Sequence, residues 1–282
     1  MEWSVLLCAI IIASTSAVLG SFLILSKQSL MADAISHAVL PGIVIAFLIS
    51  SSRASIIALI GAAAVGLLVT ASVNWLKNKA NMPGDSAIGV SYTTLFAIGI
   101  ILISQFANNV ELDQECVLFG EIGYVPFDVI RLDNETNLGP RALYVSTFLL
   151  VLIGSGIYFG YKNLSLLCFN KEFGISLGIN MVFWNYYLLS LVSVTTVVSF
   201  EMVGAILIVA LLIIPAASAY LLTKKLKQMI SLAIVFAIAS CVLGYLFAVV
   251  VNVNIAGSIA STCFVLFLIS FATSKAKGFR LA

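Results

Sequence analysis

Residues 203–221 read VGAILIVALLIIPAASAYL, and this stretch carries no charged side chain. A helix that crosses a membrane needs about 20 consecutive, mostly apolar residues, and this segment has nearly that length. The rest of the 282-residue chain has the same character, because 62% of its residues are hydrophobic and only 9% are charged. The sequence therefore predicts an all-α integral membrane protein.

Similar apolar stretches recur along the chain and predict a polytopic bundle of about nine transmembrane helices. Little sequence is left over for a separate soluble domain, so residues 1–282 are expected to form a single transmembrane domain. The expected spans are 4–25, 34–50, 54–76, 87–107, 141–160, 182–199, 203–221, 229–250 and 255–273. Spans six and seven are close together, which predicts a tight turn at 200–202.

The basic residues lie mainly in alternate connecting segments, and this asymmetry predicts the orientation. With the N-terminus outside and the C-terminus inside, three of the 14 basic residues lie in outer segments, namely Arg53, Arg131 and Arg141. The other eleven then lie in inner segments, as the positive-inside rule favours. The basic residues are spread among loops rather than gathered in a patch, so nucleic acid is not an expected partner.

The only histidine of the chain, His37, follows Asp33 by four residues near the start of the second span. Residues four apart lie on one face of a helix, so the carboxylate and the imidazole can reach the same small cation. Ionisable groups at membrane depth are costly and usually mark an ion or substrate path. Aspartate with histidine suits manganese, iron or zinc. Two ligands leave the shell open for water, backbone carbonyls or a second copy of the chain.

Structural roles for the same residues stay open at this point. Ser29 or Asp33 can cap the helix of the second span, and His37 can donate to a backbone carbonyl. Pro41 and Gly42 follow directly. Proline removes a backbone donor and bends a helix, and irregular backbone at this depth usually faces a cavity or other protein.

Two connecting segments have features of their own. In the inner segment between spans five and six, Asn170 can cap a short helix and Gly178 can end it, which gives either a docking surface or a plain connector. The long outer segment 108–140 is acidic, and its middle, 116–127, is amphipathic. That segment either lies on the membrane surface or receives a partner, or it is a solvated acidic loop.

Several chemistries find no support in the sequence. The chain has no GxxxxGK[ST] phosphate loop, no HExxH and no GxSxG motif, so neither ATP binding of that type nor hydrolysis is expected. The five cysteines include no CxxC pair, and buried cysteine usually behaves as a small hydrophobe. We expect a protein that is not an enzyme and holds no cofactor of its own.

Residues 29–42, SLMADAISHAVLPG, carry the most specific motif. They resemble the GDAxSHxxLPG pattern of permease subunits in bacterial ATP-binding-cassette (ABC) transporters for manganese, zinc and iron, with Ala32 in place of the usual glycine. Four further segments match in the family order. They are 85–90, 118–122, 169–178 (with Asn170 for the usual aspartate and Gly174 where alanine is usual) and 203–217.

The resemblance implies the permease subunit of an ABC importer for divalent transition metal ions, with manganese favoured before zinc or iron. Asp33 and His37 would coordinate the ion in transit. Two permeases, either identical or paralogous, would form the pathway at their interface. The fold would be similar to that of the vitamin B12 permease, in the bacterial cytoplasmic (inner) membrane.

The resemblance also implies partners on both sides of the lipid bilayer. Cytoplasmic ATP-binding subunits would hydrolyse ATP and dock on the inner segment at Asn170, Lys171, Glu172, Phe173 and Gly178. An extracytoplasmic metal-binding protein would deliver the ion to the outer face, where Phe119, Gly120 and Glu121 would face it.

Two other functions remain open on the sequence. The first is an ATP-independent secondary carrier or channel that uses Asp33 and His37 as a proton or ion relay and needs no docking helix at 169–178. The second is a permease for metal chelates or cobalamin. A bulky chelate needs a wide vestibule, whereas a bare ion needs ligands, so the pair of ionisable side chains favours the bare ion.

Overall fold

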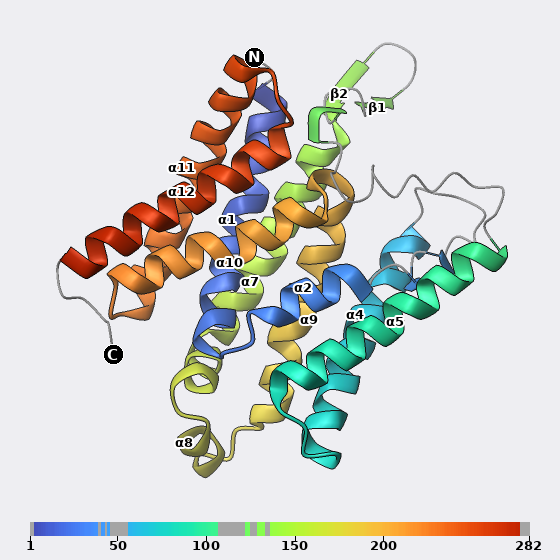
Figure 1. Cartoon of the computed structure of the whole chain (residues 1–282), viewed down its shortest axis with the longest axis vertical. Helices are drawn as coiled ribbons and strands as arrows, with labels where there is room; N and C mark the ends of the chain where they lie inside the picture. The colour runs from blue at the N-terminus through green and yellow to red at the C-terminus, as the bar shows by residue number, and fades with distance from the viewer. Residues whose placement is uncertain are drawn as a thin grey trace. The chain divides into compact units, whose positions relative to one another are not determined.

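The structure, a computed structural model, is built almost entirely of α-helices (Figure 1). It describes residues 3–38, 41–42, 44–45, 56–106, 122–124, 129–132 and 136–276. The helices are α1 Trp3–Leu25, α2 Leu30–Ala38, α4 Ile56–Lys79, α5 Gly84–Phe106, α7 Arg141–Phe169, α8 Lys171–Ser176, α9 Met181–Val203, α10 Ala205–Leu222, α11 Leu226–Val251 and α12 Ile255–Ala276. The predicted all-α architecture is confirmed.

Within the described residues, seven helices are long and apolar enough to cross a membrane, namely α1, α5, α7, α9, α10, α11 and α12. Helix α4 has 24 residues and coincides with the predicted span 54–76. Helix α2 covers the start of the predicted span 34–50, and part of that span lies outside the described residues. The described helices agree with a bundle of about nine spans.

The chain divides into two compact units, and the first comprises residues 1–27, 115–161 and 199–282. In this unit α1 packs against α10 and α11, and α12 also packs against both of them (Figure 1). Gly20 of α1 faces the backbone carbonyl of Leu212 on α10 so closely that a Cβ at Gly20 would collide with it. Small residues at such points let transmembrane helices approach each other.

Three cysteines lie in the interior of this first unit. Cys8, Cys241 and Cys263 are buried, and the thiol of Cys241 contacts the backbone oxygen of Ala9 at 3.6 Å. Their surroundings match the prediction that they act as small hydrophobic side chains.

The second unit comprises residues 28–114 and 162–198. Here α2 packs against α4 and α5, and α4 packs against α5. The Gln28 side chain, just before α2, donates a 2.8 Å hydrogen bond to the Asn185 side chain of α9. A hydrogen bond between side chains in an apolar bundle fixes the relative position of the two segments, so the start of α2 is tied to α9.

Three local expectations differ from the structure. The predicted turn at 200–202 is wrong, because α9 continues to Val203 and the chain turns at Gly204, whose φ of +82° suits glycine. The span predicted to end at 160 continues to Phe169, since no glycine or proline follows Gly160 to stop the helix. The outer segment contains an unpredicted antiparallel hairpin of β1 Val129–Leu132 and β2 Thr136–Pro140.

The contact between α1 and α10 can be tested at Gly20. The substitution Gly20→Val places a side chain against the α10 backbone and is expected to lower the free energy of unfolding by about 1–3 kcal/mol. The measurement is the thermal midpoint of the purified protein. Gly154→Ala in α7 is the control, because a Cβ there meets no atom within 4 Å. Equal midpoints for the two variants would contradict the close packing.

Candidate metal site on helix α2

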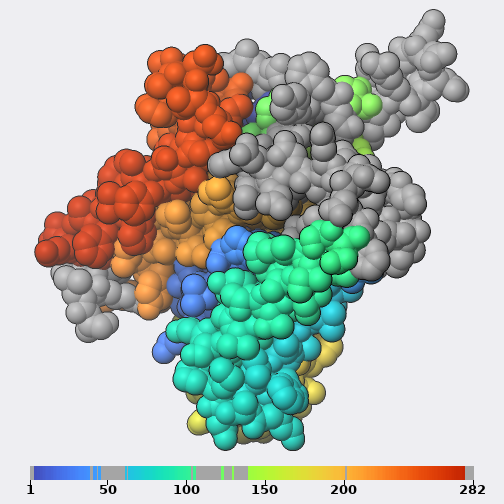
Figure 2. All heavy atoms as spheres, turned by 45° about the vertical axis from the view of Figure 1, so that its right-hand side comes forward, coloured from blue at the N-terminus to red at the C-terminus, as the bar shows by residue number. Residues whose placement is uncertain are grey.

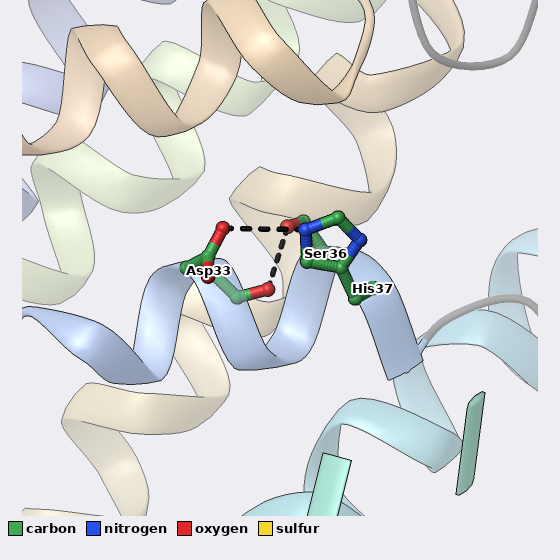
Figure 3. A network of polar contacts seen from close by, with 3 residues as sticks. All are labelled: Asp33, Ser36 and His37. Atoms are coloured by element: carbon green, nitrogen blue, oxygen red, sulfur yellow. Dashed lines mark hydrogen bonds and ion pairs between the residues drawn. The ribbon is translucent and has the colours of Figure 1, made fainter. Parts of the chain in front are cut away.

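Asp33 and His37 lie on the same face of α2, as their spacing predicted (Figure 3). The imidazole Nε2 of His37 is 3.4 Å from Oδ1 of Asp33. The His37 side chain is 39% exposed and the Asp33 side chain is 42% exposed. The pair is therefore preformed on the helix and accessible to an ion.

The separation of these two donor atoms fits joint coordination of one metal ion. Two ligand atoms, each about 2.1 Å from an ion at the tetrahedral angle, are about 3.4 Å apart. At the right angle of octahedral geometry they are about 3.0 Å apart. The observed 3.4 Å is within a small side-chain adjustment of both, so the pair can chelate a transition metal without a change in the backbone.

Ser36 lies between the two donors in sequence, but it is occupied elsewhere. Its side chain is buried, and Oγ donates a 2.7 Å hydrogen bond to the backbone oxygen of Asp33 (Figure 3). Among the described residues no group of three or more histidine, cysteine, aspartate or glutamate side chains could hold a metal ion. Within that part of the chain, Asp33 and His37 form a partial coordination shell.

Two aromatic side chains of α5 lie near the histidine, and no sequence motif indicated them. The Tyr92 ring lies 6.2 Å from the imidazole, centroid to centroid, with an interplanar angle of 32°. The Phe96 ring lies 6.1 Å away at 78°. Their spacing of four residues places both on one face of α5. That spacing was the available signal, but nothing in the sequence pairs this face with α2.

The residues after the pair fix the position of α2 rather than adding a ligand. Pro41 and Gly42 are both helical. A Cβ at Gly42 would come within 2.5 Å of the backbone oxygen of Gly61 on α4. Gly42 therefore allows close packing against α4, which supports the end of the motif that carries the donors.

The inner segment forms the short helix α8, with the two ends that the sequence predicted. Asn170 is the N-cap, and its side-chain oxygen accepts a 2.9 Å hydrogen bond from the Phe173 amide. At the other end, Gly178 has a φ of +77°. The Ile179 amide donates to the Gly174 oxygen and the Gly178 amide to the Ile175 oxygen, which is a Schellman motif. Helix α8 is thus stopped firmly on both sides.

Helix α8 presents charged and apolar side chains outward. Lys171, Glu172 and Phe173 are all exposed, and Phe173 is 52% accessible. Three more large apolar side chains nearby are also exposed, namely Phe169, Ile175 and Leu177. Gly174 is buried, and a Cβ there would collide with Met181 at the start of α9. One side of α8 is therefore anchored and the other is free to bind a partner.

The predicted outer contact residues cannot be placed in the same way. Phe119, Gly120 and Glu121 lie outside the described residues. The nearest described element is the 3-10 helix η1 Ile122–Tyr124, whose Ile122 is buried and which contacts α1 and α12. The role of Phe119, Gly120 and Glu121 stays a prediction.

The sequence and the helical fold are similar to those of known proteins. Residues 1–274 match the sequence model of the ABC 3 transport family. The chain belongs to this family. The family resemblance inferred from the motifs is confirmed, and the chain is a membrane permease of the ABC transporter class.

Individual members of the family are similar over most of their length. The manganese transport system membrane protein MntD of Bacillus subtilis (strain 168) is 40% identical over 269 residues, which are 95% of this chain and 90% of MntD. The zinc transport system membrane protein TroD of Treponema pallidum (strain Nichols) is 35% identical over 278 residues, which are 99% of this chain and 75% of TroD.

Solved structures have the same fold. PsaBC from Streptococcus pneumoniae, in complex with Fab, superposes with a TM-score of 0.78 at 33% identity, covering 95% of this chain and 90% of the compared chain. A protein described as a metal-chelate type ABC transporter, in an inward-facing conformation, gives a TM-score of 0.67 at 14% identity, covering 97% and 86%. The second likeness concerns the fold alone.

The N-cap of α8 makes a local prediction. Asn170→Ala removes the acceptor for the Phe173 amide and is expected to destabilise the helix by about 1 kcal/mol. Hydrogen exchange of the α8 amides should then be faster. Asn170→Asp is the control, since aspartate caps as well as asparagine. Unchanged protection in Asn170→Ala would show that the cap does not hold the helix.

Proposed function

We propose that this chain is the transmembrane permease subunit of an ABC importer for divalent transition metal ions. The observation that carries the proposal is the Asp33–His37 pair, with donors 3.4 Å apart on a helix of the membrane-spanning bundle. In a chain with 9% charged residues, an accessible carboxylate beside the only imidazole has a clear chemical use in transient binding of an ion.

Manganese is the proposed first substrate, before zinc and iron. MntD is named for manganese and TroD for zinc, and the ligand chemistry of aspartate and histidine accepts all three metals. An incomplete shell suits transport, because a closed cage of protein ligands would release its ion slowly.

The pathway is proposed to run between two permease subunits, either two copies of this chain or this chain and a paralogue. A partner would supply missing ligands and cover apolar surface. Helix α5, whose aromatic rings lie near His37, has several exposed apolar side chains, and the space-filling view shows α5, in green, at the surface (Figure 2). These side chains are Val90, Phe96, Ile98, Ile100 and Ile101. A patch of this kind is typical of an interaction surface or of contact with lipid.

Helix α8 is proposed to receive a cytoplasmic ATP-binding subunit, which hydrolyses ATP while this chain does not. The hydrogen bonds at both ends of α8 make it a rigid unit. Its exposed side is formed by Lys171, Glu172 and Phe173. ATP binding would then move α8 and shift the permease between outward-open and inward-open states through differential contacts.

The proposed location is the bacterial cytoplasmic (inner) membrane, with the N-terminus outside and the C-terminus inside. The distribution of lysine and arginine supports this orientation. An extracytoplasmic metal-binding protein would deliver the ion to the outer face, near Phe119, Gly120 and Glu121.

The role of the pair in transport can be tested by metal uptake. Asp33→Ala and His37→Ala, in cells with the complete transporter, are each expected to reduce manganese uptake by at least about tenfold at equal membrane abundance. Ser36→Ala is the matched control on the same helix, because it removes a hydroxyl that donates to the backbone oxygen of Asp33. Undiminished uptake in both alanine variants would show that Asp33 and His37 have a structural role and do not bind the transported ion.

An ATP-independent carrier is the competing function, and α8 distinguishes the two. Reversing both charges, with Lys171→Glu and Glu172→Lys, is expected to abolish uptake and to remove metal-stimulated ATP hydrolysis in the complete transporter. Lys79→Glu, at the end of α4, is the control for a general effect of charge reversal. Full transport after the double reversal would favour the carrier.

A further inference from the structure

Two aromatic rings of α5 lie near the imidazole of His37, both at a distance that aromatic pairs favour. Aromatic pairs are favourable when their centroids are about 4.5–7 Å apart in offset or edge-to-face arrangements. Tyr92, at 6.2 Å and 32°, lies tilted beside the ring, whereas Phe96, at 6.1 Å and 78°, meets it edge to face. The two rings therefore differ in their orientation relative to the imidazole.

The contact with Asp33 alone does not fix the imidazole. One approach of 3.4 Å between Nε2 and Oδ1 leaves the ring free to rotate about its bond to Cβ, since that torsion has broad, roughly two-fold minima. Rotation carries Nε2 away from Asp33 and breaks the two-donor arrangement. One ring tilted against the imidazole and another perpendicular to it restrict this rotation.

We propose that Tyr92 and Phe96 are positioning residues that hold the His37 ring so that Nε2 stays beside Asp33. The proposal rests on the proposed function, because it gives the two rings a role in metal affinity. Neither ring touches the ion. They act by removing rotational freedom from a ligand before the ion arrives, and such preorganisation raises affinity by reducing the entropy lost on binding.

The position of the two rings supports this role over simple space filling. Tyr92 and Phe96 lie one turn apart on α5, and α2 packs against that helix. Phe96 is still 36% exposed, so it is not a core side chain whose main contribution is burial. An aromatic ring at a partly open surface beside the chain's only histidine is well placed to orient that histidine.

The test uses the complete transporter, purified without a histidine tag and reconstituted with its ATP-binding subunits. Tyr92→Leu and Phe96→Leu are each expected to raise the KM for manganese about tenfold while the maximal rate stays within about twofold. Tyr92→Phe and Phe96→Tyr keep a ring at each position and are expected to retain the wild-type KM. Ile101→Ala, at another exposed position of α5, is the control for a general effect on that helix.

A binding measurement separates affinity from turnover. Aqueous Mn²⁺ gives an electron paramagnetic resonance signal that is lost on binding, so a titration of each variant gives its Kd for Mn²⁺. The leucine variants should bind about tenfold more weakly, in step with the KM. An unchanged Kd, a fall in maximal rate alone, or loss of affinity in Tyr92→Phe would overturn the proposal.

If the leucine variants do not assemble, Tyr92→Met and Phe96→Met replace them, because methionine keeps apolar bulk without a rigid ring; failure of these as well would mean that the rings only support the fold. Asp33→Ala and His37→Ala are measured in parallel. If these two alanine variants bind Mn²⁺ with the wild-type Kd, the proposed function itself is contradicted. If the alanine variants bind weakly but Tyr92→Leu and Phe96→Leu bind normally, only the positioning role of the two rings is contradicted.

Discussion

The Asp33–His37 contact on α2 is the interaction on which the functional interpretation depends. A carboxylate and an imidazole in an apolar bundle lose hydration, and that loss is costly unless the groups have a partner. Here each side chain has the other at 3.4 Å and remains partly exposed. Both donors are therefore accessible to a cation. The same separation matches the distance between neighbouring ligands of a first-row metal.

The surroundings of α2 are arranged to keep this pair in place. Gln28 ties the start of the helix to Asn185 of α9, and Gly42 lets the chain beyond the pair pack against α4. These two features add to the buried apolar side chains of α2, Met31 and Ile35, because close approach at glycine and hydrogen bonds between helices matter more where lipid removes most of the hydrophobic driving force. Helix α8, which is proposed to receive the ATP-binding subunit, is short but has both ends satisfied by hydrogen bonds, which limits fraying.

Much of this arrangement could be predicted from the sequence because it is local. The spacing of Asp33 and His37 sets their contact, and Asn170 with Gly178 sets the ends of α8. The family motifs indicated the class of protein in the same way.

The features that the sequence did not predict depend on tertiary contacts. The ring contacts of Tyr92 and Phe96 need α5 beside α2, which no local pattern encodes. The turn expected at 200–202 lies instead at Gly204, because glycine tolerates the φ of +82° found there.

The proposal that His37 binds the transported ion can be tested by electron spin-echo envelope modulation of Mn²⁺ on the complete, tag-free transporter. His37 is the only histidine of the chain, so a bound imidazole has one source within this subunit. We expect modulation by a directly coordinated imidazole nitrogen, and this modulation should disappear in His37→Ala. Bound Mn²⁺ without nitrogen modulation, or modulation that persists in His37→Ala, would contradict it.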